Sequence, residues 1–173
     1  MTHWYILSVV GKDRPGIVSH VTTALYDGGC NLGETSMIRL GDSFTIMMMV
    51  RHDGTVKSLQ NLLATVAESM GLHVHVDNMD GHLHRHLEPD VHITVYGADR
   101  PGIVAHVTGA LAEAGLNIVN LDSDVGGTED QPLYVMHIDG VAGEGIKALE
   151  SALDVVVKEG VEARLSPIDT MIG

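Results

Sequence analysis

The sequence has few basic residues and almost no aromatic ones. Lys and Arg number 10 against 23 Asp and Glu, which gives a formal net charge of −13. This balance excludes the broad basic surface through which nucleic-acid-binding proteins release counterions from phosphates. It equally disfavours docking on an anionic membrane. We therefore expect no direct nucleic-acid partner and no membrane partner.

Cysteine and long hydrophobic runs are scarce as well. Cys30 is the single cysteine, so no disulfide forms within the chain, which suits a reducing compartment. The longest aliphatic run, residues 46–50, is far too short to span a bilayer. The first residues lack the basic start and apolar core of a signal peptide. With 45% hydrophobic and 19% charged residues, the chain is predicted to be a soluble, globular, cytoplasmic protein.

What the sequence does contain is an internal repeat. Residues 11–25 recur as residues 97–111, at an offset of 86, with only 3 positions changed. Gly71 and Gly160 close the second helical stretch of each copy at an offset of 89, so the second copy is about three residues longer. We place the extra residues in 126–132. The chain is therefore two copies of one module.

Each copy predicts the same order of elements. Short β-branched runs at 3–10 and 90–96 predict strands, and helices follow at 15–27 and 101–114, where apolar residues recur every four positions. The other predicted strands are 31–40, 44–50, 72–77, 117–125, 133–138 and 161–166, and the second helices follow the apolar spacing over 56–70 and 146–156. The order βαββαβ, repeated twice, favours an α+β fold with two ferredoxin-like modules. Each would be a four-stranded antiparallel sheet with two helices on one face.

A polar, histidine-rich segment separates the two copies. It predicts a first domain over 1–80, a linker over 81–89 and a second domain over 90–173. A module of about 80 residues has only a marginal core of its own. We therefore expect the modules to pair, or the chain to form a homo-oligomer.

The turn between the first strand and the first helix of each copy carries the strongest functional signal. Pro15 suits the first helical position, so Gly16 and Ile17 would offer backbone N–H groups at the positive end of the helix. Asp13 would be free to accept a hydrogen bond from an ammonium group. Together these groups suit a zwitterion such as a free amino acid. Proline and aspartate are also ordinary helix-entry residues, so that simpler interpretation stays open.

The repeated βαββαβ order resembles the ACT domain, a small-molecule sensing module. The resemblance depends on Asp-Arg-Pro-Gly-Ile-Val at the first helix and on Gly-x-Asn-Leu or Gly-x-Asn-Ile at the second strand. Outside the linker, the whole chain resembles free-standing tandem ACT proteins of the glycine cleavage repressor type. The resemblance implies that a small amino acid, such as glycine or serine, binds at an interface between two modules without a cofactor. The ligand-binding residues that it implies are Asp13, Arg14, Pro15, Gly16, Ile17 and Asn31 in the first copy and Asp99, Arg100, Pro101, Gly102, Ile103 and Asn117 in the second.

No enzyme domain is left over in the chain. The resemblance therefore implies a non-enzymatic regulator that acts through a protein partner, a transcription factor or an enzyme. The sequence contains no His-Glu-x-x-His, Gly-x-Ser-x-Gly or paired Cys-x-x-Cys motif.

Asn31 and Asn117 also have a plainer explanation than ligand binding, as turn residues after a helix. A module that only contacts other proteins, and an enzyme with an unfamiliar motif, stay open as alternatives.

Histidines supply a further alternative. His82, His84 and His86 alternate, so an extended chain would place all three on one side, as part of a zinc, nickel or copper site in a metal-binding accessory protein. A solvated polar linker is the simpler explanation, because a metal site needs fixed geometry. His20 lies one helical turn after Gly16 and is expected to lean back towards the loop.

Overall fold

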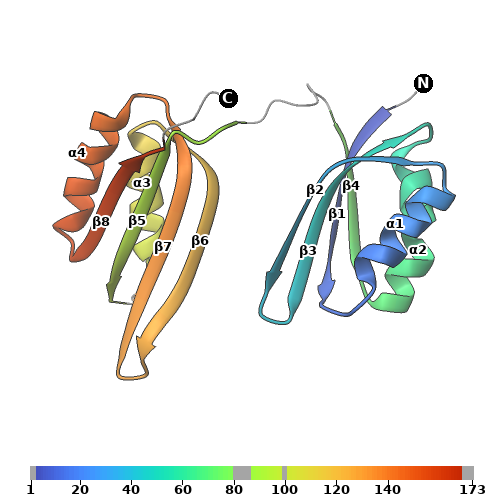
Figure 1. Ribbon diagram of the computed structural model, residues 1–173, viewed down its shortest axis with the longest axis horizontal. Helices are drawn as coiled ribbons and strands as arrows, with labels where there is room; N and C mark the ends of the chain where they lie inside the picture. The colour runs from blue at the N-terminus through green and yellow to red at the C-terminus, as the bar shows by residue number, and fades with distance from the viewer. Residues whose placement is uncertain (1–2, 80–86, 99–100, 169–173) are drawn as a thin grey trace. The chain divides into compact units, whose positions relative to one another are not determined.

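The computed structural model describes residues 3–79, 87–98 and 101–168. The chain divides into two compact units, residues 1–83 and 84–173 (Figure 1). Both units have the element order strand, helix, strand, strand, helix, strand. No helix in the described ranges is long and apolar enough to cross a membrane.

The first unit is a four-stranded antiparallel sheet in the order β2-β3-β1-β4. Its helices α1 and α2 cover one face of this sheet (Figure 1). The bounds are β1 (His3–Lys12), α1 (Ile17–Asp27), β2 (Asn31–Leu40), β3 (Ser43–His52), α2 (Val56–Met70) and β4 (His73–Asn78).

The second unit repeats this plan with the strand order β6-β7-β5-β8. The bounds are β5 (Val91–Ala98), α3 (Ile103–Glu113), β6 (Leu116–Thr128), β7 (Gln131–Ala142), α4 (Ile146–Val157) and β8 (Val161–Pro167). The predicted fold class, two βαββαβ modules with antiparallel sheets, is confirmed.

Each core lies between one sheet face and its helices. On β1 the side chains of Leu7 and Val9 are fully buried in the first core, together with Val21 and Leu25 from α1. Successive strand residues point to opposite faces, so the residues between them point away from the helices. The helix-free face of each sheet is called its open face below.

The strands β2 and β6 are the edge strands on the side of each sheet next to β3 and β7. All residues of β2 are exposed, as are those of β6 apart from Leu116 and Ile118. Several of the exposed residues are large and apolar, such as Ile38 at 61% and Leu40 at 77%. An edge strand offers unpaired backbone groups to another strand, and the exposed apolar side chains of β2 and β6 make these edges suited to strand pairing.

The extra residues of the second copy lie in the hairpin between β6 and β7. The first predicted strand ends at residue 125 and the next begins at residue 133, whereas β6 continues to Thr128 and β7 begins at Gln131. Gly127 has a φ of +85°, a left-handed conformation that glycine adopts without strain. The insertion therefore lengthens the hairpin instead of forming a loose loop.

Candidate functional site

The loop between β1 and α1 ends in a left-handed glycine. Gly16 is the N-cap residue of α1 with a φ of 89°, and the helix begins at Ile17. The prediction that Pro15 occupies the first helical position is therefore wrong: Pro15 lies in the turn before the cap. A residue with a Cβ adopts such a backbone conformation only under strain, so the loop requires glycine at this position.

His20 leans back to this loop, as its spacing predicts. Its Nδ1 lies 2.7 Å from the carbonyl oxygen of Gly16, and its backbone N–H donates to the same oxygen at 2.9 Å. A carbonyl oxygen only accepts, so Nδ1 carries the proton. The imidazole thus holds the glycine cap from the first turn of the helix.

A hollow of about 380 Å³ opens between this loop and the edge strand β2. Its lining residues are Asp13, Arg14, Gly16, Ile17, Val18, Ser19, Met37 and Phe44. The first N–H groups of an α-helix have no partner within the helix and bear a partial positive charge. A small anionic group such as a carboxylate therefore fits where the hollow meets the start of α1.

Asp13 is held in place from two sides. Its Oδ2 accepts from Nε of Arg39 at 2.8 Å, and its backbone N–H donates to the carbonyl oxygen of Asp42 at 2.8 Å. The carboxylate that was expected to be free is thus already engaged through one oxygen. The sequence did not reveal Arg39 and Met37 on β2, because the contact of β2 with the loop depends on tertiary packing. The lining residues Val18, Ser19 and Phe44 were not expected either.

The second copy of the loop has the same cap. Gly102 is the N-cap residue of α3 with a φ of 88°, and Pro101 lies before it as Pro15 does before Gly16. Ile103 is buried at the start of the helix. Asp99 and Arg100 lie outside the described residues.

His106 differs from its counterpart His20. Its Nδ1 lies 3.3 Å from Oε2 of Glu159, which follows α4 in sequence. His20 on α1 therefore contacts the cap of its own helix, whereas His106 on α3 contacts the segment that follows α4.

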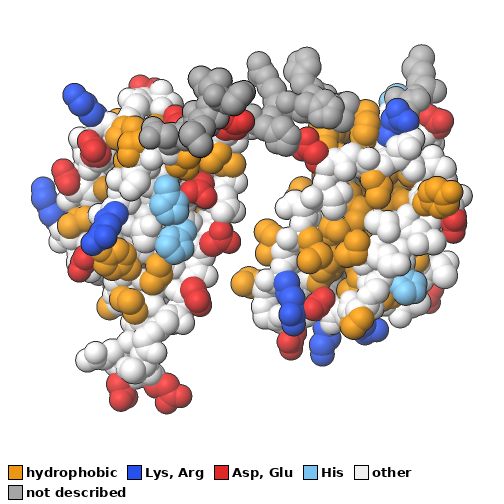
Figure 2. Space-filling view, in the orientation of Figure 1, with side chains coloured by type: hydrophobic (Ala, Val, Ile, Leu, Met, Phe, Trp, Pro, Cys, Tyr) orange, Lys and Arg blue, Asp and Glu red, His pale blue; other side chains and the backbone are white. Residues whose placement is uncertain are grey.

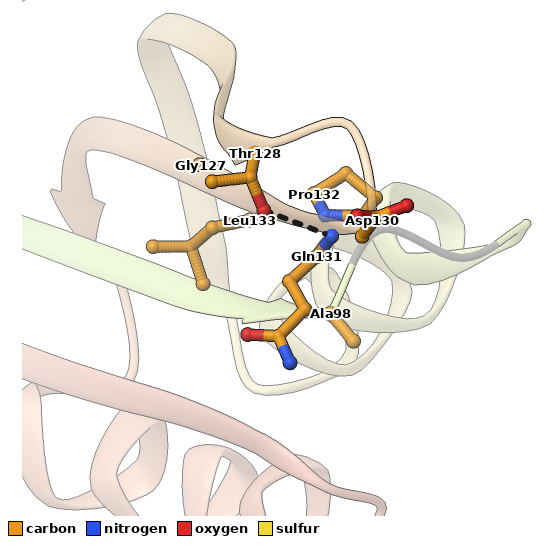
Figure 3. Close-up of a pocket in the computed structure, with 7 residues that line it drawn as sticks. All are labelled: Ala98, Gly127, Thr128, Asp130, Gln131, Pro132 and Leu133. Carbon is orange, nitrogen blue, oxygen red and sulfur yellow. Dashed lines mark hydrogen bonds between the residues drawn. The ribbon is translucent and has the colours of Figure 1, made fainter.

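The hairpin tip of the second unit forms a larger hollow of about 660 Å³ beside the end of β5 (Figure 3). Its lining residues are Ala98, Gly127, Thr128, Asp130, Gln131, Pro132 and Leu133. Within it the backbone N–H of Gln131 donates to Oγ1 of Thr128 at 3.2 Å. The lengthened hairpin thus lies beside the end of β5, where the first unit has only the shorter hairpin between β2 and β3.

Asn31 lies far from the loop within its own module. Arg51 of β3 pairs with both Trp4 and Asn31, so Asn31 is level with the start of β1, whereas the loop follows its end. Nine residue steps along β2 separate Asn31 from Leu40, on the order of 30 Å. Asn117 is placed likewise, exposed at the start of β6 and paired with Val141. Asparagine and loop can therefore act together only if they come from different modules.

Cys30 is buried at 8% exposure, as is Leu116, which occupies the equivalent position in the second copy, at 7%. Burial raises the pKa of its thiol above the ordinary value of 9.0. Its Sγ lies 3.5 Å from Nδ1 of His52, whose Nε2 lies 2.9 Å from Oγ of Ser58. The hydroxyl of Ser58 donates to the carbonyl oxygen of Thr55, so His52 donates a hydrogen bond from Nε2 and accepts one from the Cys30 thiol at Nδ1.

The linker histidines His82, His84 and His86 lie outside the described residues. Elsewhere, within residues 3–79, 87–98 and 101–168, no three His, Cys, Asp or Glu side chains are grouped to hold a metal ion. His73 and His75 on β4 are exposed.

Comparison with known proteins identifies both modules. Residues 3–77 match one model of the ACT domain, and residues 91–157 match another. The chain belongs to the ACT-domain family and carries two ACT modules in tandem. The resemblance seen in the Asp-Arg-Pro-Gly-Ile-Val loops is thereby confirmed.

The relatives of this tandem ACT protein include regulatory proteins. The glycine cleavage system transcriptional repressor of Escherichia coli K12 is 23% identical over 137 residues, which cover 79% of this chain and 72% of that protein. An unknown protein from Galdieria sulphuraria superposes with a TM-score of 0.78 at 25% identity, covering 97% of this chain and 99% of that one. A structure provisionally named as a glycine cleavage system transcriptional repressor superposes with a TM-score of 0.71 at 19% sequence identity. The match covers 98% of this chain and 99% of that one.

Proposed function

We propose that this tandem ACT protein is a non-enzymatic regulator that binds a small amino acid, such as glycine or serine, between two modules. The β1–α1 loop of one module and the start of the edge strand of another would form the site. The observation that carries the proposal is the hollow between Asp13, Gly16 and Met37, which opens beside the edge strand β2.

The direction of β2 supports a site shared by two modules. If two such edge strands pair antiparallel, the start of one lies beside the end of the other. Asn31 then lies next to Leu40 of the neighbouring module, close to its loop. An asparagine that is remote from the loop within its own module thus reaches the loop of its neighbour in a homo-oligomer.

The chemistry of such a site suits a zwitterion. The helix start at Ile17 would hold the carboxylate through backbone N–H groups, and the left-handed Gly16 leaves room for its approach. The ammonium group would donate to the carboxylate of Asp13 and to the amide oxygen of Asn31 from the neighbour. The corresponding residues in the second copy are Pro101, Gly102, Ile103 and Asn117, with Asp99 and Arg100 expected to complete the set.

The amino acid would alter the affinity of the protein for a protein partner in the cytoplasm, either a transcription factor or an enzyme. A net charge of −13 disfavours direct contact with DNA, so a repressor-like role would be exerted through another protein. Such coupling is reciprocal, so the partner would change the amino-acid affinity by the same factor.

Isothermal calorimetry of the full chain against glycine, serine and the other small amino acids tests the proposal. We expect saturable binding that is weakened at least tenfold in Asp13→Ala or Asp99→Ala, because each removes a charge-assisted hydrogen bond. Asp154→Ala, an exposed position on α4 outside both loops, is the matched control and should bind as the original chain does.

The two loops are distinguished by comparing the two aspartate variants. Loss in only one of them assigns binding to that loop, and Asn31→Ala or Asn117→Ala then identifies which strand completes it. Absence of binding across the whole panel would overturn the amino-acid site and leave a tandem ACT module that acts through protein contacts alone.

A further inference from the structure

Four polar side chains form a cluster in the middle of the second sheet. They are His92 and Thr94 on β5 and His137 and Asp139 on β7, where His92 is paired with Asp139 and Thr94 with His137. They alternate with the buried Val91 and Ile93 and therefore lie on the open face. Figure 2 shows histidine side chains gathered on the visible surface of this unit.

Hydrogen bonds orient the first imidazole. Nδ1 of His92 donates to Oδ1 of Asp139 at 2.6 Å. A carboxylate only accepts, so the proton of the neutral ring lies on Nδ1 and the lone pair on Nε2. Carboxylates hold metal-binding histidines in this way, fixing the ring and raising the basicity of the ligating nitrogen.

The imidazoles of His92 and His137 both approach the hydroxyl oxygen of Thr94. Nε2 of His92 lies 3.2 Å from Oγ1 of Thr94, and Nδ1 of His137 lies 3.3 Å from that same oxygen. The two rings stack with centroids 5.7 Å apart and an interplanar angle of 20°. Two imidazole nitrogens from different strands thus converge on one hydroxyl group.

We propose that this cluster binds a divalent transition-metal ion such as Zn²⁺ through Nε2 of His92 and Nδ1 of His137. Without metal, the Thr94 hydroxyl donates to Nε2 of His92 and accepts from Nδ1–H of His137, so binding requires the neutral His137 ring to carry its proton on Nε2 instead. The ion would take the place of the Thr94 hydroxyl group, which turns away by rotation about χ1. Zinc–nitrogen bonds are about 2.0–2.1 Å long, so each nitrogen moves inward by roughly 1 Å. Asp139 remains on the far side of His92 and holds its ring.

Two protein ligands leave coordination positions open. Asp139 faces the other nitrogen of His92, and no set of three His, Cys, Asp or Glu side chains in the described residues is arranged to hold an ion, so water or a small chelating molecule completes the shell. The site is reachable, because the side chain of His92 is 39% exposed. Asp122 is paired with His137 across the strand and adds negative charge, whereas Arg164, paired with Thr94, opposes it. We therefore expect moderate affinity and an ion able to exchange ligands.

The first sheet provides a comparison within the same chain. At the equivalent positions it has Ile6 and Ser8 on β1, paired with Met49 and Met47 on β3. The two copies keep the same loop motif but differ here, where one has an apolar surface and the other two histidines and a carboxylate. The metal site thus belongs to the second module alone and is independent of the amino-acid site.

Zinc titration by calorimetry, on chain purified without a tag, tests this proposal. The full chain with His82, His84 and His86 all replaced by Ala removes the linker as a competing site. We expect one equivalent of Zn²⁺ to bind this chain, at least tenfold more weakly after His92→Ala or His137→Ala. Asp139→Asn should weaken binding about tenfold, as losses of outer-shell partners do. Thr94→Val, which removes the competing hydroxyl group, should bind at least as tightly.

His75→Ala is the matched control, since it removes a histidine–carboxylate pair from the other sheet, with Nε2 of His75 2.9 Å from Oδ2 of Asp77. It should leave zinc binding unchanged. The metal-induced rise in Tm should be lost in the His92 and His137 variants whatever their metal-free Tm, which separates binding from folding. Unchanged affinity in both variants, or no saturable binding in the starting chain, would overturn the site.

Discussion

Nε of Arg39 donates to Oδ2 of Asp13 at 2.8 Å and so ties the end of β2 to the β1–α1 loop. The same strand is an edge of its sheet, paired with β3 on one side. A ligand that binds at the loop and a module that pairs with the edge would therefore act on directly connected elements. This gives a short physical route from occupancy of the loop to association of modules.

The Asp13–Arg39 pair should contribute little to folding. Its side chains are 31% and 63% exposed, and ion pairs of this kind are worth about 0.2–1 kcal/mol. Arg39→Ala and Asp13→Asn should each lower the free energy of unfolding by less than about 1 kcal/mol in urea titrations. A larger loss would mean that weakened ligand binding in Asp13 variants reflects unfolding instead of a lost contact.

The left-handed glycine caps should contribute more to the free energy of unfolding than the Asp13–Arg39 ion pair does. Gly16→Ala forces a side chain into a conformation with a φ of 89° and places its Cβ 3.2 Å from the His20 ring, so we expect a loss of about 1–2 kcal/mol in unfolding free energy. Gly102→Ala has the same strain but a distance of 3.8 Å to His106, so its loss should be smaller.

Gly109→Ala is the control for these glycine variants. Gly109 lies inside α3, and a Cβ there would meet nothing within 4 Å. Alanine should therefore stabilise the second module by about 0.5–1 kcal/mol. Urea unfolding of all three variants checks the order, and equal effects at Gly16 and Gly109 would refute the cap argument.

Local patterns in the sequence predicted most of the fold. The repeat and the spacing of apolar residues gave the order of elements in both copies, and residues 31–40 were predicted as the strand that the structure shows. These features depend on the alternation of apolar and polar residues and on the helical period, both of which are local properties of the sequence. The helix start was misplaced by two residues, because proline suits several positions near a cap while only the backbone shows that Gly16 is left-handed.

Contacts between distant segments could not be predicted in the same way. Arg39 meets Asp13, and His92 meets Asp139, only because specific strands pair in a specific register. The alternation of His92 with Thr94, and of His137 with Asp139, places each pair on one strand face. Nothing in the sequence says that these faces adjoin. The separation of Asn31 from its own loop likewise follows only from the strand order.

The exposed edge of the first sheet should control association. Ile38 on β2 is 61% exposed, and a charge there would oppose pairing with another strand. Ile38→Asp should reduce the mass in sedimentation equilibrium towards that of the monomer, with little change in unfolding free energy. Val155→Asp, at a similarly exposed 57% on α4, should leave the mass unchanged. Equal behaviour of the two variants would exclude β2 as the contact.

The buried thiol of Cys30 should make stability fall at alkaline pH. Burial raises the pKa of this thiol above 9.0 in the folded chain, whereas the unfolded chain has the ordinary value. Between the two pKa values the unfolded state has lost a proton that the folded state keeps, so rising pH favours unfolding. The contribution of the neutral thiol to the free energy of unfolding is complete below the pKa of the unfolded chain. It is lost as the pH rises through the higher pKa of the folded chain. One proton limits its slope to about 1.4 kcal/mol per pH unit.

Cys30→Ala isolates this effect from the tyrosines and lysines that titrate in the same range. The variant should unfold more easily at pH 7, since it loses the contact of Sγ with Nδ1 of His52. The difference in unfolding free energy between the original chain and the variant should then shrink as the pH rises from about 8 to about 10, a range centred on the ordinary thiol pKa of 9.0. A difference that stays constant over this range would mean that Cys30 ionises as readily in the folded chain as in the unfolded one. The thiol would then have to be open to water and not held against His52.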